Sequence, residues 1–289
     1  MRDYFSLVTF SHTVFALPFA LVGFTLAVLQ PAYPFAWPDL LFVVGCMVFA
    51  RNAAMAFNRL ADADFDALNA RTAVRDIPAG RISRRRAGAF VAVNAVLFSI
   101  CAFALNSTCG WLSPVALLVV LGYTYTKRFT WLCHLVLGLG LALAPVGAYM
   151  AVTAGTTWAV VALGLTVLFW VAGFDVLYAL QDRGFDVSQG LRSIPTRFGE
   201  SRSFLLSRGL HVSSAACLAL SLYLVAERYP EATLGIAVAY VSFVAALVYQ
   251  QSLVAPGDLS RIDRAFFTTN GIVSVVFASV LIGSLTLLS

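Results

Sequence analysis

Two groups of acidic side chains carry the spacing most suggestive of chemistry. The first group is Asn58, Asp62 and Asp66, which repeat every four residues, and Arg51 lies seven residues before Asn58. If this segment continues as an α-helix, the side chains share one face. Carboxylate and carboxamide oxygens suit Mg²⁺, which proteins usually hold through one or two carboxylates together with substrate phosphates. The alternative interpretation of this group is a solvated, charged helix end.

The second group is Asp175, Asp182 and Asp186, at steps of seven and four residues, with Tyr178 beside it. This spacing again predicts one helical face. Asp175 lies about two turns inside an apolar stretch, where an unpaired charge is costly, so a functional role is the first hypothesis there. The alternative is a buried acid that an arginine pairs for packing.

Basic side chains follow and separate the two acidic groups. They are Arg71, Arg75, Lys127, Arg128, Arg183 and Arg192. Acids and bases around one opening match the needs of a diphosphate bound with Mg²⁺, because the metal bridges carboxylate to phosphate while Arg and Lys contact the remaining oxygens. Membrane topology alone also places bases in such loops, and it explains Arg81 and Arg84 to Arg86 better than substrate binding does.

The elements that must position these side chains are membrane-spanning helices. Hydrophobic residues make up 60% of the 289 residues and charged residues 11%, against roughly 45–50% and 25% in soluble domains. Despite the net charge of +5, this excludes a soluble enzyme, a disordered chain and a nucleic-acid-binding module. A helix needs about 20 apolar residues to cross the hydrocarbon core. Nine such stretches are predicted, at about 11–29, 39–57, 86–105, 111–126, 132–153, 158–180, 204–226, 231–252 and 265–288.

The distribution of bases predicts the orientation of these helices. All Lys and Arg residues except Arg51 and Arg228 fall at the N-terminus or in the loops after the second, fourth, sixth and eighth stretches. The positive-inside rule then places the N-terminus and these loops in the cytoplasm and the C-terminus outside, in a multi-pass protein of the inner membrane.

The two acidic groups also suggest an internal repeat. Asp62 and Asp182 have the same separation as Asp66 and Asp186, 120 residues (182 − 62 and 186 − 66), and an Arg-x-Ile-Pro segment follows each group. We therefore expect one domain over residues 1–289. It would contain a possible pseudo-repeat of two four-helix units, about 11–126 and 132–252, followed by a ninth helix.

The same segments resemble the motifs of UbiA-type membrane prenyltransferases. NRLADADFD from Asn58, followed by RTAVRDIP from Arg71, looks like the first motif of this family. YALQDRGFD from Tyr178, followed by GLRSIPTRFG, looks like the second, and YTYTKR from Tyr123 matches the pattern between them. One departure is Arg59, which stands where many members have Asp, so one possible metal ligand is lacking.

The resemblance implies an all-α integral membrane fold, with nine transmembrane helices in a bundle around a central cavity that cytoplasmic loops cap. The metal ligands, which also count among the catalytic residues, would be Asn58, Asp62, Asp66, Asp182 and Asp186. Asp175 would be a further catalytic residue. The substrate-binding residues would be Arg51, Arg71, Arg75, Tyr123, Lys127, Arg128, Tyr178 and Arg192.

Within the family, HTVFALPFA from His12 and RNAAMAFNRL from Arg51 resemble the branch that prenylates aromatic carboxylic acids in quinone biosynthesis. The likeness is greatest to 4-hydroxybenzoate polyprenyltransferase-like members of the futalosine route to menaquinone. It implies Mg²⁺-dependent transfer of a polyprenyl group from a polyprenyl diphosphate to a ring carbon of 4-hydroxybenzoate or 1,4-dihydroxy-6-naphthoate. The choice of acid, the prenyl length and the base that takes the ring proton stay open. Arg51 would bind the acceptor carboxylate or order Asn58, with snorkelling toward the interface as the alternative.

Three other functions are compatible with parts of the sequence. A UbiA-type enzyme could use another acceptor, such as haem, chlorophyllide, a sugar phosphate or a lipid. A secondary transporter also has intramembrane acids and repeats, but its acids are expected near the midplane rather than at one membrane face. An inactive paralogue would not need the whole set of ligands. We expect structural or interfacial roles for His12 and His134, and we assign none to His211.

Overall fold

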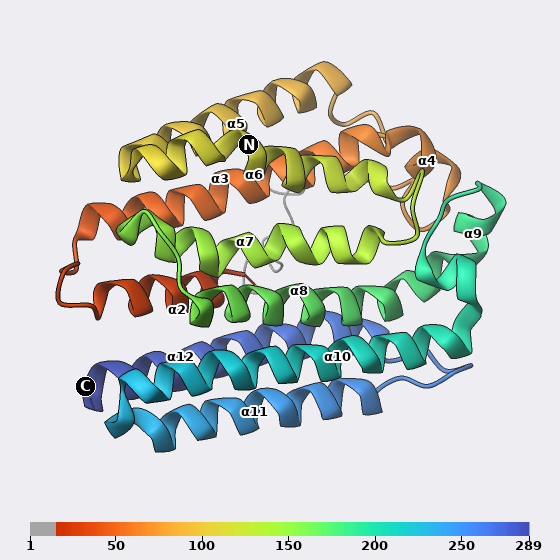
Figure 1. Ribbon diagram of the computed structural model, residues 1–289. Coiled ribbons are helices and arrows are strands. Elements are labelled where there is room, and N and C mark those ends of the chain that lie inside the picture. The colour runs from red at the N-terminus through yellow and green to blue at the C-terminus, as the bar shows by residue number, and fades with distance from the viewer. Residues whose placement is uncertain (1–15, 289) are drawn as a thin grey trace.

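The computed structural model describes residues 16–288, and the regular elements of this part of the chain are all helical (Figure 1). The α-helices are α2 Leu17–Val28, α3 Trp37–Ala61, α4 Ala63–Leu68, α5 Arg84–Leu105, α6 Ser107–Thr126, α7 Cys133–Thr153, α8 Trp158–Tyr178, α9 Arg183–Ser188, α10 Ile194–Arg228, α11 Thr233–Ser252 and α12 Asn270–Leu288. Shorter 3₁₀ turns are η2 Ala179–Asp182 and η3 Pro230–Ala232, and η4 Arg264–Thr269 is a π-helical turn.

The described residues contain eight helical segments that are long and apolar enough to cross a membrane, and α2 is a shorter apolar helix. These nine segments overlap the nine predicted stretches, so the prediction of an all-helical membrane protein is confirmed. The start of the first stretch and His12 lie outside the described residues. The internal repeat stays a prediction.

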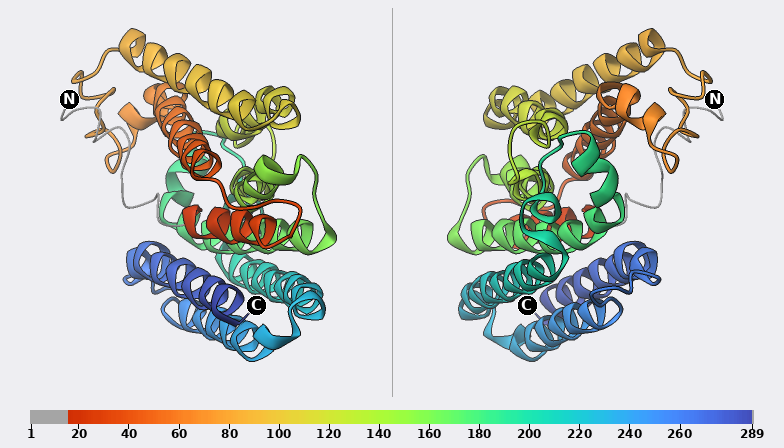
Figure 2. Two further views of the ribbon diagram at one scale, coloured as in Figure 1. Left: turned by 90° about the vertical axis from the view of Figure 1, so that its left-hand side faces the viewer. Right: turned by 90° about the vertical axis from the view of Figure 1, so that its right-hand side faces the viewer.

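The long helices lie in three layers, which the two views of Figure 2 show from the ends of the bundle. One layer holds α3, α5 and α6, the middle layer holds α2, α7 and α8, and the last holds α10, α11 and α12. The middle and last layers share a core in which Phe19 packs against Trp170 and Phe277, with ring centroids 5.3 and 5.2 Å apart. Gly23 of α2 lies against the backbone of α7, where a Cβ would meet the Pro145 carbonyl oxygen at 2.1 Å, so only glycine allows this approach.

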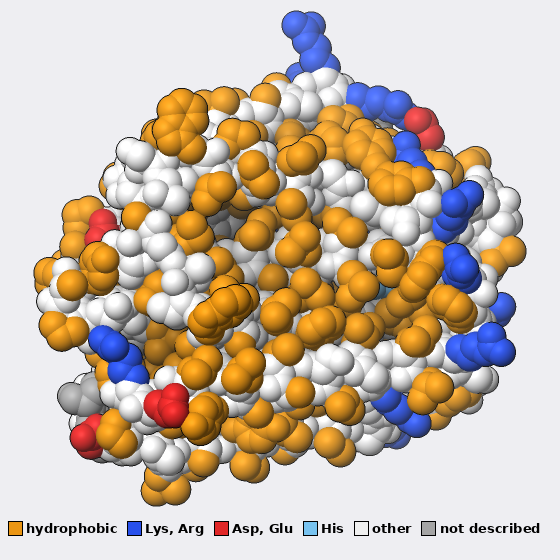
Figure 3. Space-filling model, viewed as in Figure 1, with side chains coloured by type: hydrophobic (Ala, Val, Ile, Leu, Met, Phe, Trp, Pro, Cys, Tyr) orange, Lys and Arg blue, Asp and Glu red, His pale blue; other side chains and the backbone are white. Residues whose placement is uncertain are grey.

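The connections that follow α3, α6, α8 and α11 gather at one end of the bundle, on the right in Figure 1. Lys and Arg side chains concentrate at this end in Figure 3, while apolar side chains cover the broad flank of the helices. We call it the basic end, made of residues 62–83, 127–132, 179–193 and 253–263. The fold therefore brings together the loops that the positive-inside rule assigns to one side of the membrane.

Neither acidic group lies on one uninterrupted α-helix, which corrects the predicted geometry. α3 ends at Ala61, and Asp62 has φ −98° and ψ 8° before α4 begins. α8 ends at Tyr178 and passes through η2 into α9. The i to i+4 hydrogen bond from the Asp66 N–H to the Asp62 carbonyl, 2.8 Å, still spans the first break. After each break the chain turns over the helix end, and Asp66 and Asp186 are buried there against basic side chains of neighbouring segments.

α10 begins ten residues before the predicted start at 204. Ser193 and Thr196 form a capping box at Ile194, with Pro195 in the first turn. The helix then kinks at Gly199, whose φ of 78° favours glycine. The prediction located this helix by its apolar residues, so it missed the first turns, which are polar.

Candidate functional site

A cavity of about 780 Å³ lies between the layer of α3, α5 and α6 and the helices α7 and α8. Most of its lining is apolar, with polar side chains toward the basic end. The predicted site residues that line it are Arg51, Asn58, Arg75, Tyr123, Asp175 and Tyr178. The cavity is thus an apolar chamber, and its lining residues Asn58 and Arg75 contact Asp62 and Asp66 at the basic end. We call this charged region next to the chamber the opening.

At this opening, Asp62 is held by groups from two segments. The Asn58 side chain donates from Nδ2 to Asp62 Oδ2 at 3.1 Å, and Arg128 donates from Nη2 to Asp62 Oδ1 at 3.1 Å. Arg128 also donates to the Ala61 carbonyl at 2.7 Å, which fixes the guanidinium over the end of α3. Burial raises the pKa of the Asp62 carboxyl above its ordinary value, although the hydrogen bond from Arg128 opposes this shift.

Asp66 points back to the loop that follows its own helix. It is buried, and Arg75 Nη1 lies 2.9 Å from both of its carboxylate oxygens. The Thr72 hydroxyl donates to the Asp66 backbone carbonyl at 3.2 Å, which ties the loop to α4. Asp66 and Arg75 therefore form an ion pair within the first motif.

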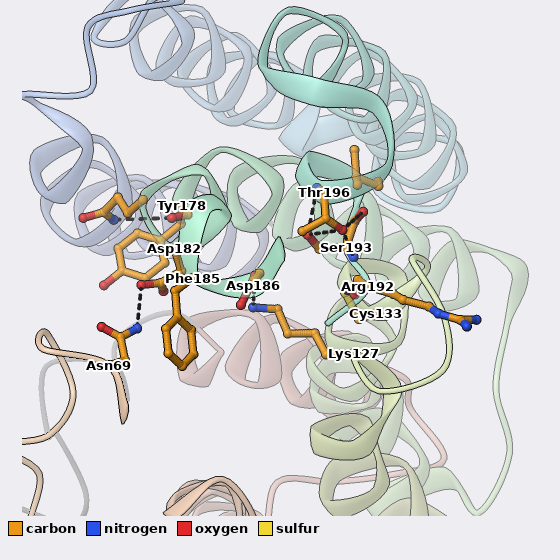
Figure 4. A network of polar contacts seen from close by, with 12 residues as sticks. Asn69, Lys127, Cys133, Tyr178, Asp182, Phe185, Asp186, Arg192, Ser193 and Thr196 are labelled. Carbon is orange, nitrogen blue, oxygen red and sulfur yellow. Dashed lines mark hydrogen bonds and ion pairs between the residues drawn. The ribbon is translucent and has the colours of Figure 1, made fainter. Parts of the chain in front are cut away.

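Asp182 joins the two motifs. Arg71 donates to its carboxylate from Nε at 3.0 Å and from Nη2 at 2.5 Å. The Asn69 side chain donates from Nδ2 at 3.3 Å, as Figure 4 shows. Both partners lie more than 110 residues earlier in the sequence. These contacts bring the second acidic group beside the loop of the first, as a shared opening requires.

Asp186 is 2% exposed and accepts a hydrogen bond from Lys127 Nζ at 2.7 Å. Burial acts to lower the pKa of Lys127, but the Asp186 carboxylate more than offsets this, so the pKa is raised. Lys127 also lies within electrostatic range of Asp62 and Asp182. Lys127 thus carries a positive charge that acts on acids of both motifs.

Arg192 does not join this cluster. Its backbone N–H donates to the Lys127 carbonyl at 2.7 Å, and its guanidinium donates from Nη1 to the Phe129 carbonyl at 2.9 Å. In Figure 4 its side chain extends away from Lys127 and Asp186. The structure thus gives Arg192 a role in holding loops together and does not bring its side chain to the opening.

Asp175, in the cavity wall, pairs with a residue that the sequence did not indicate. His134 Nδ1 lies 2.6 Å from Asp175 Oδ2, and its other nitrogen, Nε2, accepts the Ile194 N–H at 3.3 Å. Because Nε2 is an acceptor, Nδ1 carries the proton and donates to the carboxylate. The partner expected for a purely structural Asp175 was an arginine. No local signal in the sequence links two residues 41 positions apart.

The donor set at the opening consists of hard oxygen ligands, the kind that Mg²⁺ prefers, but each carboxylate is paired with a base. Within residues 16–288, no three His, Cys, Asp or Glu side chains come close enough to hold a metal ion together. Each of four carboxylates is instead paired with a different base, in the pairs Asp62–Arg128, Asp66–Arg75, Asp182–Arg71 and Asp186–Lys127. Hard oxygens from two helix ends meet here with side chains that bind phosphate well.

Comparison with known proteins gives consistent matches over nearly the whole chain. The family model described as the UbiA prenyltransferase family matches residues 16–272. A 4-hydroxybenzoate octaprenyltransferase of Tolumonas auensis is 29% identical over 84% of this chain and 82% of its own length. The protein of the same name from Edwardsiella ictaluri is 30% identical, over 89% of this chain and 91% of its own.

Solved structures show the same fold. An apo UbiA homologue from Aeropyrum pernix K1 has a TM-score of 0.82 and 31% identity, covering 94% of this chain and 97% of its own. A UbiA homologue from Archaeoglobus fulgidus, bound to DMAPP and Mg²⁺, has a TM-score of 0.78 and 22% identity, covering 99% of this chain and 100% of its own.

Proposed function

The chain is a member of the UbiA prenyltransferase family and a multi-pass membrane transferase, and we propose that it prenylates an aromatic carboxylic acid in quinone biosynthesis. The donor would be a polyprenyl diphosphate and the acceptor 4-hydroxybenzoate or 1,4-dihydroxy-6-naphthoate. The observation that carries this proposal is an apolar 780 Å³ cavity whose lining residues Asn58 and Arg75 contact Asp62 and Asp66, two acids of the paired cluster at the basic end. The names of the relatives support the acceptor class, and the DMAPP- and Mg²⁺-bound neighbour supports the donor and the metal.

Asn58 and the four paired carboxylates would hold Mg²⁺, which when bound supplies positive charge to neutralise the leaving diphosphate. Arg71, Arg75, Lys127 and Arg128 would then donate to diphosphate oxygens. In the structure these same bases neutralise the carboxylates. The acids would then hold the metal and the bases the diphosphate, so each ligand should favour binding of the other.

The transfer itself follows from charge and geometry. The C1–O bond of the prenyl diphosphate breaks, and its electron pair leaves with the diphosphate. An acceptor ring carbon supplies the electron pair of the new C–C bond to the resulting allylic cation. The ring proton then passes to the Asp175 carboxylate, which His134 orients. Arg51 would bind the acceptor carboxylate, and Tyr123 would orient the ring.

The protein would lie in the inner membrane, with its basic end facing the cytoplasm. A transporter is a poorer interpretation, since the four paired acids gather at one end of the bundle. No feature of the cavity favours haem, chlorophyllide, a sugar phosphate or a lipid as the acceptor.

The test is a transfer assay with the purified protein in lipid vesicles. A polyprenyl diphosphate is offered with either acid, with Mg²⁺ or with excess EDTA, and products are identified by mass. We expect a ring-prenylated acid in the presence of Mg²⁺ and none with EDTA. Equal turnover in EDTA, or prenylation of neither acid, would overturn the proposal.

A further inference from the structure

The last membrane segment begins with the π-helical turn η4, which lies outside both acidic motifs. Such turns are rare and occur often at functional sites. Its consecutive residues Phe266 and Phe267 both line the cavity. Their rings lie 4.1 and 5.8 Å from that of Tyr178, and Phe266 lies 5.0 Å from Phe174. We call these four side chains, which all line the cavity, the aromatic wall.

Buried amides hold this turn from the side of α11. Gln250 is 1% exposed, and its Nε2 donates to the Ala265 carbonyl and to Asn270 Oδ1, both at 2.9 Å. The Thr269 hydroxyl donates to the Arg264 carbonyl at 3.1 Å. Polar groups buried in a membrane protein are costly unless they are paired. These contacts therefore fix the turn, and with it the direction of both phenylalanines.

The aromatic wall lies between the charged opening and the proposed base. Tyr178 is three residues after Asp175 and four before Asp182. It lies within electrostatic range of Arg71 and Asp182, and Figure 4 shows it beside Asp182. A prenyl diphosphate whose phosphates sit at the opening would place its allylic carbon at the start of the apolar chamber. The aromatic wall borders that region.

We propose that the aromatic wall, through the faces of Phe266, Phe267 and Tyr178, stabilises the allylic cation formed when the C1–O bond breaks. The inference rests on the proposed function and adds catalytic residues to it. Aromatic faces carry partial negative charge and attract cations most strongly where water is excluded. A neutral prenyl chain gains much less from them, so the attraction acts chiefly on the transition state.

The first test uses Phe266→Leu and Phe267→Leu, which keep an apolar side chain but remove the ring. We expect kcat to fall by roughly two- to thirty-fold in each, with KM for both substrates nearly unchanged. Phe266→Tyr retains the ring and should keep kcat close to that of the unaltered protein. Phe103→Leu is the matched control, because Phe103 is exposed on the outer side of α5 and does not line the cavity.

A binding measurement separates charge from packing. A prenyl ammonium ion and the neutral prenyl alcohol of equal length each compete with the prenyl diphosphate, in the presence of inorganic diphosphate and Mg²⁺. The ratio of their two affinities measures the preference for the cation. We expect each Leu variant to reduce this preference by roughly two- to thirty-fold. If a Leu variant loses affinity equally for the ammonium ion and the alcohol, the ring acts by packing. If acceptor KM rises while kcat is unchanged, the ring stacks on the acceptor, and if neither changes, it has no role. Each of these results overturns the proposal. If the unaltered protein makes no prenylated product, the proposed function itself fails.

Discussion

Arg51 should distinguish the acceptor from the donor, because it lies deeper in the cavity than the charged opening. It lines the cavity seven residues before Asn58 on α3, about 10 Å away at roughly 1.5 Å per residue. Arg51→Lys keeps the charge but loses the planar fork that binds a carboxylate through two hydrogen bonds. A lost charge-assisted hydrogen bond costs about 1.5–3 kcal/mol. The apparent affinity for the aromatic acid should therefore fall roughly ten- to a hundredfold.

The assay varies each substrate in turn while the other is saturating. We expect the apparent affinity for prenyl diphosphate to change less than about threefold, since 10 Å exceeds the reach of a direct contact. Arg85→Lys, on the exposed first turn of α5, is the matched control and should behave like the unaltered protein. Equal losses for both substrates would place Arg51 in the metal and diphosphate shell or in the structure of α3. A loss for the donor alone would refute its role with the acceptor.

Three further predictions concern the opening, the base and the orientation. Alanine at any one of the paired carboxylates should remove most transfer while the protein still inserts into the membrane. These carboxylates are Asp62, Asp66, Asp182 and Asp186. Full activity in all four variants would contradict the Mg²⁺ site. His134→Phe removes the donor to Asp175, so kcat should fall roughly ten- to a hundredfold at nearly constant KM for both substrates. If KM changes and kcat does not, His134 is a packing residue. Cysteines placed at Ala79 and Gln189 should react with an impermeant reagent from the cytoplasmic side and one at Glu231 from the outside, and the reverse pattern would invert the orientation.

The sequence determined the parts of this protein that depend on local composition and period. Apolar length located the membrane helices, because the thickness of the hydrocarbon core sets the number of residues that a span requires. The bases predicted which loops share one end, and the fold brings those loops together. Spacing and residue type also selected Asn58, Arg75 and Asp175, which line the cavity. Their proposed roles still await the experiments above.

Only the tertiary structure decided which charge meets which. The sequence did not indicate that Asp182 would pair with Arg71, that Asp175 would pair with His134, or that Arg192 would turn away from the acids. The pattern of apolar residues also did not predict the π-helical turn that brings Phe266 and Phe267 into the cavity. These features depend on contacts between segments 40 or more residues apart, or on buried amides such as Gln250 that act across helices. A helical period describes the face of one helix, whereas the partner of that face is set by how the helices pack.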